Sequence, residues 1–273
     1  RWKLGAALLL GVLVTVGPLG LRAIRPSATA VDDDDTLTVM SCNLCFGTAD
    51  ADRLISWIDE VDPDVIVLQE YGGGWPEVVR TRLTSAYPHV IENPQQNAFG
   101  SATLSRMPIL DRTMFTWPGD FDVKMPRITI EHAGREVDVT NVHVVPPVAL
   151  SWVRRQMAQV AELAQEGARR LGGTSGPHEV DGAIFAGDFN APWNTNHLRP
   201  LARAGLWEAH ARVGSSRGAT WGPRRGLLSL APGIRLDHAV YGGDLEPVFS
   251  VVGPDVGSDH RPIAVGFRWR TPD

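Results

Sequence analysis

The sequence predicts an α/β fold in which two β-sheets pack together and helices cover their outer sides. Apolar runs of strand length outnumber the helical segments along the chain. Some runs are apolar at every position, as at residues 65–68, which is typical of a strand buried on both faces. Many of the runs end in a polar side chain. Together these observations favour two packed layers of strands over a helical bundle.

The composition is that of a globular domain with a substantial core. The chain has 273 residues, of which 43% are hydrophobic and 21% charged. Its formal net charge is −5, so no basic excess indicates nucleic-acid binding. The acidic balance is weak evidence, because a metal site collects carboxylates whatever its substrate is.

The first 35 residues differ from the rest of the chain. Residues 4–21 carry no charge and are rich in Leu, Val, Ala and Gly, with basic residues on both sides. We therefore expect residues 1–24 to form one hydrophobic helix, either a membrane anchor or the apolar part of an export signal. Residues 25–35, with four aspartates, predict an acidic linker. The chain begins with Arg and not Met, so further residues are expected before it.

The anchor sets the expected location of the protein. We expect it at the cell membrane with its domain outside the cytoplasm, or secreted if a signal is cleaved. The domain itself is expected at residues 36–270, and nothing in the sequence indicates a protein partner.

Apolar spacing and stop signals define the elements of this domain. Asp50 is a candidate N-cap for a helix at residues 51–60, which Pro63 ends. Further helices are expected at residues 75–85, 150–171 and 198–204, and glycine-rich loops at 72–74 and 172–178. The expected strands are residues 36–43, 65–68, 98–104, 128–131, 135–145, 183–190, 235–241, 249–252 and 262–269.

The two cysteines form a C-x-x-C pattern at Cys42 and Cys45. In a redox pair the first cysteine lies at a helix N-terminus, whereas the residues before this pair are predicted to form a strand. Three residues apart on a strand, the two side chains point to opposite faces, about 10 Å apart, and cannot be bridged. We interpret them as two small buried hydrophobic residues.

The strand at residues 183–190 carries the most informative stretch. It ends in Gly187, Asp188, Phe189 and Asn190. In extended chain, Asp188 and Asn190 point the same way, so a carboxylate and a carboxamide lie on one side of the strand end. Such a pair can hold a water molecule and donate to a charged oxygen. The simpler alternative is a strand followed by an Asx turn.

Other expected strand ends carry polar side chains of the same kind. Glu70 follows four apolar residues, and a carboxylate there is an oxygen ligand for a hard cation such as Mg²⁺. The full set is Asn43, Glu70, His143, Asp188, Asn190, Asp237, Asp259 and His260.

These residues, read in order, resemble the endonuclease/exonuclease/phosphatase superfamily. The resemblance rests on Asn43, Gln69-Glu70, residues 141–143, residues 187–190, Leu236-Asp237 and residues 258–262, and it covers residues 36–268. Each motif alone is weak, but six in order are specific. The resemblance implies a four-layer α/β/β/α sandwich and metal-dependent cleavage of phosphate esters, with Mg²⁺ as the expected cation and Mn²⁺ as its alternative.

The resemblance also implies roles for individual residues. Glu70 becomes a metal ligand supported by Asn43 and Asp259. Asp188 orients or deprotonates the attacking water, while Asn190 and His143 hold phosphate oxygens. His260 contacts the scissile phosphate, and Asp237 fixes its other ring nitrogen.

One position departs from the family pattern. Some members have a second carboxylate two residues after the first-strand asparagine, where this chain has Cys45. A thiol is a poor Mg²⁺ ligand, so a second metal there is not expected.

The substrate remains open between three classes: nucleic acid, phospholipid and a small phosphate ester. A lipid phosphodiesterase and a nuclease are the main rivals, and a catalytically silent binding module on the same fold is the alternative of another class. The intact set of polar residues argues against loss of catalysis.

A few more side chains are candidates for a role in binding. Trp75, Trp117, Trp193 and Trp221 are expected in loops, where they stack bases, enter a lipid interface or fill the core. Arg106 is expected to be structural and His238 to be a core or surface residue. Arg127 and the pair Arg224-Arg225 are expected on a solvated face.

Overall fold

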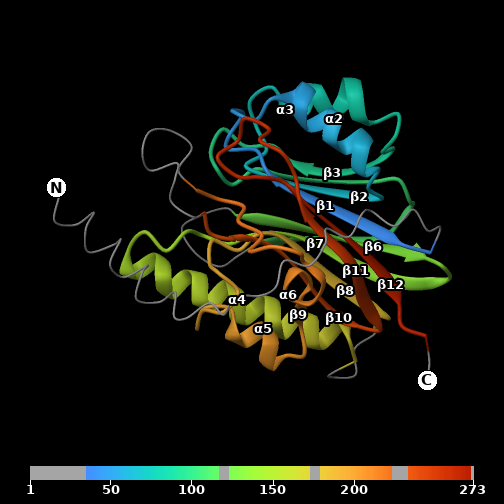
Figure 1. The fold of residues 1–273 in the computed structure, drawn as a ribbon, viewed down its shortest axis with the longest axis vertical. Helices are drawn as coiled ribbons and strands as arrows, with labels where there is room; N and C mark the ends of the chain where they lie inside the picture. The colour runs from blue at the N-terminus through green and yellow to red at the C-terminus, as the bar shows by residue number, and fades with distance from the viewer. Residues whose placement is uncertain (1–34, 117–122, 173–178, 223–232, 272–273) are drawn as a thin grey trace.

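Two six-stranded mixed sheets pack face to face, and helices cover both outer sides (Figure 1). The computed structural model describes residues 35–116, 123–172, 179–222 and 233–271. The expected four-layer α/β/β/α sandwich is confirmed.

The first sheet carries the start and the end of the domain. Its strand order is β11-β12-β1-β2-β4-β3. The strands β1 and β2 run parallel, with Asn43 opposite Gln69, so their carboxyl ends lie side by side. The bounds are β1 (Leu37–Asn43), β2 (Val65–Gln69), β3 (His89–Asn93), β4 (Ser101–Ser105), β11 (Leu245–Val252) and β12 (Ile263–Trp269).

The second sheet has the order β5-β6-β7-β8-β10-β9. Its strands β7 and β8 run parallel, and β10 runs antiparallel to β8. In this register His143 lies opposite Asp188, and Asp188 lies opposite Asp237. The bounds are β5 (Ile109–Thr116), β6 (Lys124–His132), β7 (Arg135–His143), β8 (Gly182–Asp188), β9 (Trp207–Glu208) and β10 (Asp237–Gly243).

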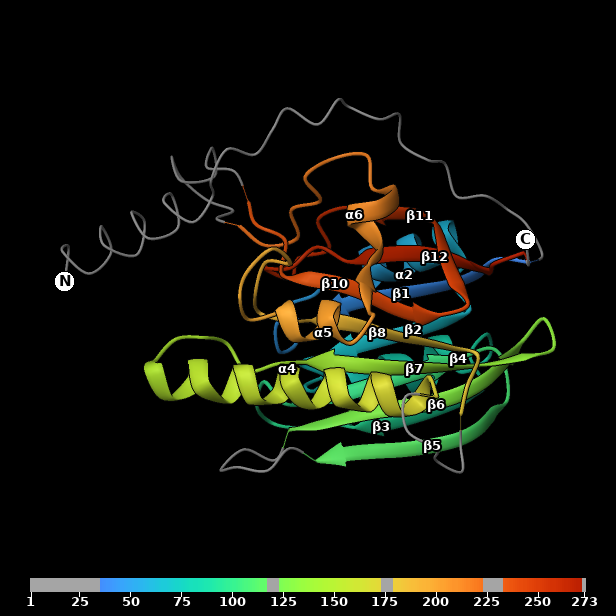
Figure 2. The ribbon, with the colours of Figure 1, turned by 90° about the horizontal axis from the view of Figure 1, so that it is seen from below.

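Figure 2 shows α4 and α5 along the outer side of the second sheet, and Figure 1 shows α2 and α3 outside the first. Asp50 caps α2 as expected, because its side chain accepts from the backbone N–H groups of Asp52 and Arg53. The bounds are α2 (Ala51–Val61), α3 (Trp75–Val78) with a wider π turn (Val79–Leu83), α4 (Leu150–Arg170), α5 (Arg199–Arg203) and α6 (Ala209–Val213).

The apolar core has three parts, one between the sheets and one under each helical layer. All of the buried residues in these clusters lie between Leu37 and Phe267. Among the described residues, the core is thus built by the two sheets and the helices that cover them.

A polar link joins the two sheets in the middle of this core. The Gln69 side chain donates to Asn141 Oδ1 at 2.8 Å, and Asn141 Nδ2 donates to the carbonyls of Leu68 and Ala102. All these groups are buried, so breaking one of the bonds would leave a buried polar group unpaired. The bonds therefore stabilise one position of the two sheets relative to each other.

Several sequence expectations need correction. The strand expected at residues 98–104 begins at Ser101, and the one at 183–190 ends at Asp188. Three strands and a helix were missed: β3, β5, β9 and α6. Edge strands explain β3, β5 and β9, since an edge strand has a weak apolar pattern.

Three individual side chains also differ from expectation. Arg127 is buried and pairs with Glu166, instead of lying on a solvated face. Cys45 lies in a loop after β1 and is half-buried, although both cysteines are free as expected. Trp75 begins α3 and is buried.

Other expectations hold or fall outside the described residues. Arg106 is structural, because it pairs with Asp62 and lies over the Tyr87 ring. Trp117 and the pair Arg224-Arg225 lie outside the described residues. Residues 4–21 lie outside them too, so the membrane anchor stays a prediction. None of the helices in the part that the structure describes is long and apolar enough to cross a bilayer.

Candidate active site

Strand register gathers the expected residues at one end of the sandwich. The first sheet contributes Asn43 from the end of β1 and Glu70 directly after β2. The second sheet contributes His143, Asp188 and Asp237, which stand opposite one another on three neighbouring strands. These polar side chains therefore meet where both sheets end.

Gly187 allows the two central strands of this site to approach closely. It has φ 151°, and an added Cβ would lie 1.9 Å from the carbonyl oxygen of Val142. Only glycine fits here without a backbone shift. The glycine thus sets the position of Asp188, the next residue.

Asn43 connects the carboxylates of the two sheets. Its Nδ2 donates to Glu70 Oε1 and to Asp188 Oδ2, each at 3.1 Å. Its Oδ1 accepts from the backbone N–H of Cys45 at 2.9 Å. The amide thus orients both carboxylates, and its oxygen keeps a second lone pair that a cation can use.

Asp188 is held by Asn190 through an Asx turn. The backbone N–H of Asn190 donates to Asp188 Oδ1 at 2.8 Å, and its Nδ2 donates to Asp188 Oδ2 at 3.1 Å. Asn190 has φ 48°, so the chain folds back after β8 and does not continue the strand. Its Nδ2 also donates to the Val144 carbonyl at 2.9 Å. The Asx turn therefore forms and orients the carboxylate. A hydrogen bond from Asn190 to a charged substrate oxygen stays a prediction.

His260 and Asp237 form a buried, hydrogen-bonded pair. His260 Nδ1 lies 2.8 Å from Asp237 Oδ2, and His260 Nε2 lies 3.7 Å from Asp188 Oδ2. Burial alone would lower the pKa of His260, but Asp237 and Asp188 raise it to about 10. The imidazole is therefore charged at neutral pH, with its Nε2 side turned to Asp188.

His143 faces the same carboxylates from the other side. Its Nε2 lies 3.8 Å from Asp188 Oδ2 and 3.9 Å from Glu70 Oε1. Burial lowers the pKa of His143, so this imidazole is neutral at pH 7. The site thus holds one charged and one neutral histidine around one carboxylate.

Asp188 has the properties of a base that works near neutral pH. It is buried, and that burial raises its pKa to about 6, with Asp237 adding to the rise and His260 opposing it. A carboxylate with a raised pKa is a better proton acceptor than an ordinary aspartate.

Asp259 lies at the exposed rim of the site. The exposed indole of Trp221 donates to Asp259 Oδ2 at 3.3 Å. The neighbouring Ser258 hydroxyl donates to the Asn43 carbonyl at 2.6 Å and accepts from the His260 N–H at 3.1 Å. Ser258 therefore fixes the loop that carries Asp259 and His260 against the end of β1.

A divalent cation fits beside Glu70. Burial raises the pKa of Glu70, and the charge of Asp259 adds to the rise while Asn43 opposes it. Among the described residues, no ion pair joins Glu70 to an arginine or a lysine. Glu70 and Asp259 offer carboxylate oxygens, the type of ligand that a hard divalent ion prefers, and the charged His260 acts on both of them.

Asp188, Asp237 and His260 also stand close enough to be considered as metal ligands. One ligand atom from each lies within 4.8 Å of the others. However, Asp237 and His260 already bond to each other, so this group is better suited to proton chemistry than to a cation.

Sequence reasoning missed the residues that support this pair. The Thr220 hydroxyl accepts from the backbone N–H groups of Leu236 and Asp237, each at 3.1 Å. Behind it, the buried Glu208 pairs with Arg235 and His238. His238 is thus a core residue. Thr220 comes from an irregular loop, and no sequence pattern indicated it. Trp221 is among the tryptophans expected in loops, but nothing in the sequence indicated its bond to Asp259.

The fold and this site define the class of protein: a metal-dependent phosphoric ester hydrolase. The sequence profile of the Endonuclease/Exonuclease/phosphatase family matches residues 40–260. The chain belongs to that family. The expectation of an enzyme, as opposed to a silent binding module, is confirmed. No curated protein matches the chain.

Solved structures share the fold at low sequence identity. An endonuclease/exonuclease/phosphatase from Beutenbergia cavernae is 19% identical, with a TM-score of 0.69, over 86% of this chain and 72% of that one. The 3′ phosphatase NExo from Neisseria, bound to a product DNA hairpin, is 18% identical, with a TM-score of 0.67, over 85% and 100%. D. rerio TDP2 with a single-strand DNA product is 15% identical, with a TM-score of 0.66, over 85% and 99%.

Proposed function

We propose that this protein is a membrane-tethered, Mg²⁺-dependent phosphoesterase that hydrolyses phosphodiester bonds by attack of an oriented water. The observation that carries the proposal is the arrangement around Asp188. Its Oδ2 lies 3.8 Å from a neutral imidazole, His143, and 3.7 Å from a charged one, His260. A base that lies beside one neutral and one charged imidazole donor suits phosphoryl transfer.

Each residue of this group has a distinct task. Asp188 accepts a proton from the attacking water, because its pKa of about 6 leaves it ionised at pH 7. His143 donates a hydrogen bond to one phosphate oxygen. Asn190 donates to another by giving up its bond to Asp188 or to the Val144 carbonyl. His260, kept charged by Asp237, adds a charge-assisted hydrogen bond as negative charge grows on the phosphate.

Glu70 and Asp259 are the residues that would hold the cation, with Asn43 orienting Glu70. When bound, Mg²⁺ supplies positive charge to the phosphate oxygens, and Mn²⁺ has the same preference for oxygen ligands. The tether is proposed from the sequence of residues 4–21 alone.

The substrate is proposed only as a class of phosphate esters. The solved structures of NExo and D. rerio TDP2 contain DNA products, which favours a nucleic acid. The tether favours a substrate held at a membrane, and the lack of a basic excess argues against tight binding of duplex DNA. A panel of plasmid DNA, RNA, sphingomyelin, phosphoinositides and a soluble chromogenic phosphodiester separates these.

The test of the chemistry is Glu70→Gln in the full chain. This change removes one ligand charge at nearly constant volume, so Mg²⁺-dependent hydrolysis should fall by about 10²-fold or more while the fold persists. The control is Glu246→Gln, because Glu246 is an exposed glutamate on β11 that pairs with Arg268. Rates are measured against Mg²⁺ concentration on the chromogenic ester. A wild-type rate for Glu70→Gln in limiting Mg²⁺ would refute the assignment.

A further inference from the structure

We propose that the loop between β7 and α4, residues 146–150, docks the active-site end of the domain onto a phospholipid bilayer. The loop would enter the interfacial layer of the lipid and hold the site against the membrane surface. This proposal rests on the proposed anchor at residues 4–21, but not on the proposed chemistry.

The loop is apolar and projects into water. Its sequence is Pro-Pro-Val-Ala-Leu, and all but its first residue are exposed. Val148 and Leu150 are 73% and 69% exposed, the highest values among the large hydrophobic residues that the structure describes. Such a run of exposed aliphatic side chains is costly in water and indicates a surface that is covered in use.

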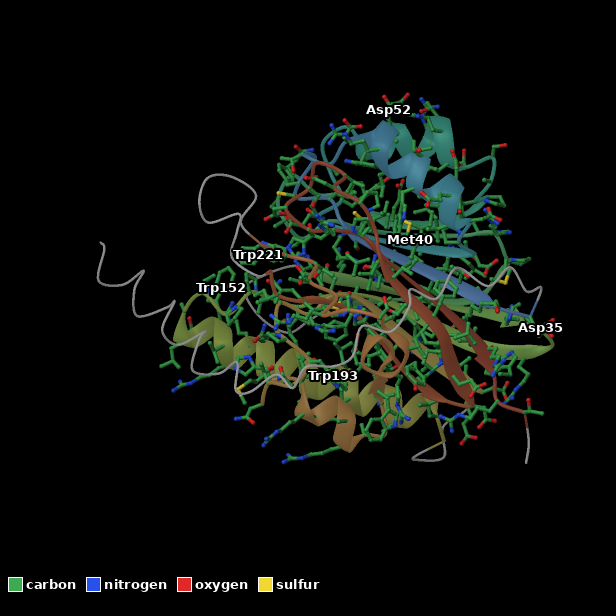
Figure 3. The ribbon with its side chains drawn as sticks, viewed as in Figure 1. Asp35, Met40, Asp52, Trp152, Trp193 and Trp221 are labelled. Atoms are coloured by element: carbon green, nitrogen blue, oxygen red, sulfur yellow. The ribbon has the colours of Figure 1, made fainter. Side chains whose placement is uncertain are left out.

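The position of the loop ties it to the active site. It begins three residues after His143 in the sequence, at the end of the sandwich where the site is built. Phe46 and Trp221 are exposed at the same end, Phe46 after β1 and Trp221 next to His260. Figure 3 shows Trp152 and Trp221 at the end of the molecule opposite Asp35.

Backbone strain supports a purpose for Phe46. Cys45, Phe46 and Gly47 all have positive φ, at 47°, 47° and 87°. A bulky residue in this conformation is rare and persists only where the surroundings enforce it. Here it turns an aromatic ring outward, 40% exposed, at the rim of the site.

The residues after the loop fit a lipid interface. Trp152 is half-buried in the first turn of α4, and Arg154 is exposed two residues later. In a bilayer, aliphatic side chains enter the acyl-chain region, tryptophans lie at the interface and cations meet the headgroups. The loop, Trp152 and Arg154 follow this order along the chain. Aliphatic side chains do not stack on bases, and the chain has no basic excess, so a bilayer is favoured over nucleic acid.

The linker is long enough for this orientation. The described residues begin at Asp35, which Figure 3 shows at the end opposite Trp152. The proposal therefore requires that residues 22–35 can span the length of the sandwich. A strand of nine residues spans about 30 Å. Fourteen extended residues span about 45 Å, so the linker reaches from one end to the other.

The test measures backbone hydrogen exchange of residues 149–152 in the full chain, held in nanodiscs of phosphatidylcholine and phosphatidylglycerol. The neighbouring N–H groups of Val148 and Val153 are already hydrogen-bonded in the protein. An engineered protease site in residues 25–35 then releases the domain, and an unchanged circular dichroism spectrum checks that the released domain stays folded. Ala149 gives α4 no side-chain cap, so its first amides exchange fast in water and report coverage well. We expect exchange about fivefold or more slower in the nanodisc than after release.

Matched variants make the result specific. Val148→Asp with Leu150→Asp should abolish the protection and leave hydrolysis of a soluble ester unchanged. Leu110→Asp is the control, because Leu110 is 54% exposed at the opposite end of the second sheet and should leave the protection intact.

Five outcomes would overturn the proposal. Exchange that is fast both before and after release means that the loop does not dock, and a chain that does not stay with the nanodisc lacks the anchor on which the proposal rests. Protection that persists in the released domain after the nanodiscs are removed means that a second copy covers the loop. Equal protection of the full chain in an amphipathic polymer without lipid means that its own N-terminal segment covers it. Protection of the released domain by an oligonucleotide assigns the loop to nucleic acid.

Discussion

The charge on His260 depends on Asp237, and Asp237→Asn tests that dependence. Asp237 Oδ2 lies 2.8 Å from His260 Nδ1, and it is the strongest influence that raises the pKa of His260 to about 10. With asparagine at position 237, two influences on the pKa of His260 remain. Asp188, 3.7 Å away, raises this pKa, and burial of the imidazole lowers it. We expect the pKa of His260 to fall close to its ordinary value of about 6.5.

The size of the effect follows from the fraction of charged imidazole. At pH 8, wild-type His260 stays almost fully charged, whereas a pKa of about 6.5 leaves about 3% charged. If the charged form acts on the phosphate, Asp237→Asn loses about 30-fold in rate at pH 8 and about tenfold more at pH 9. At pH 6.5 the loss shrinks to about twofold, while the wild type stays level from pH 7 to 9.

The assay is the initial rate on a soluble chromogenic phosphodiester with saturating Mg²⁺, from pH 6 to 9. An NMR titration of the His260 ring measures its pKa directly, and Asp244→Asn, at an exposed ion pair with Arg135, is the control. A profile for Asp237→Asn that runs parallel to the wild type would refute the reasoning. So would additive losses in the Asp237→Ala and His260→Ala pair, because residues that act as a unit lose little more when both are removed.

Three further predictions concern stability and location. Gly187→Ala should destabilise the fold by about 3 kcal/mol or more in chemical denaturation, because its Cβ meets a β7 carbonyl, whereas Gly74→Ala has open space and should change stability by under about 1 kcal/mol. The raised pKa of His260 stabilises the fold fully below about pH 6.5 and loses this effect as pH rises through about 10, so the unfolding free energy should fall across that window in calorimetry; no fall would contradict it. The full chain should resist carbonate extraction from membranes, and a soluble form that begins at Val31 would show a cleaved signal instead.

The strand ends of the site could be predicted from the sequence, because continuous apolar runs stop there. Glu70 follows four apolar residues, and the run before Asp188 ends in a glycine, so both carboxylates are visible as strand-end groups. Parallel pairing then places such ends together. His143 and Asp188 are in register for this reason, although the sequence does not show which strands are neighbours.

Other features depend on partners that are distant in the sequence. Arg127 was expected in solvent, yet Glu166 on α4 and Asp138 on β7 compensate its charge inside the protein. Asn43 is expected beside a metal, and its amide bonds to two carboxylates that are 27 and 145 residues away in the sequence. Composition and spacing cannot reveal such pairings.

The site is shared between two sheets, and Asn43 is the residue that spans them. Its amide donates to Glu70 in its own sheet and to Asp188 in the other, so one neutral group with two N–H donors satisfies both carboxylates. An aspartate here would add a third negative charge, and an aliphatic residue would leave both carboxylates without this donor. Deeper in the core, Gln69 and Asn141 join the same two sheets. The distance between the cation ligand and the base is therefore fixed by sheet packing, and not by either sheet alone.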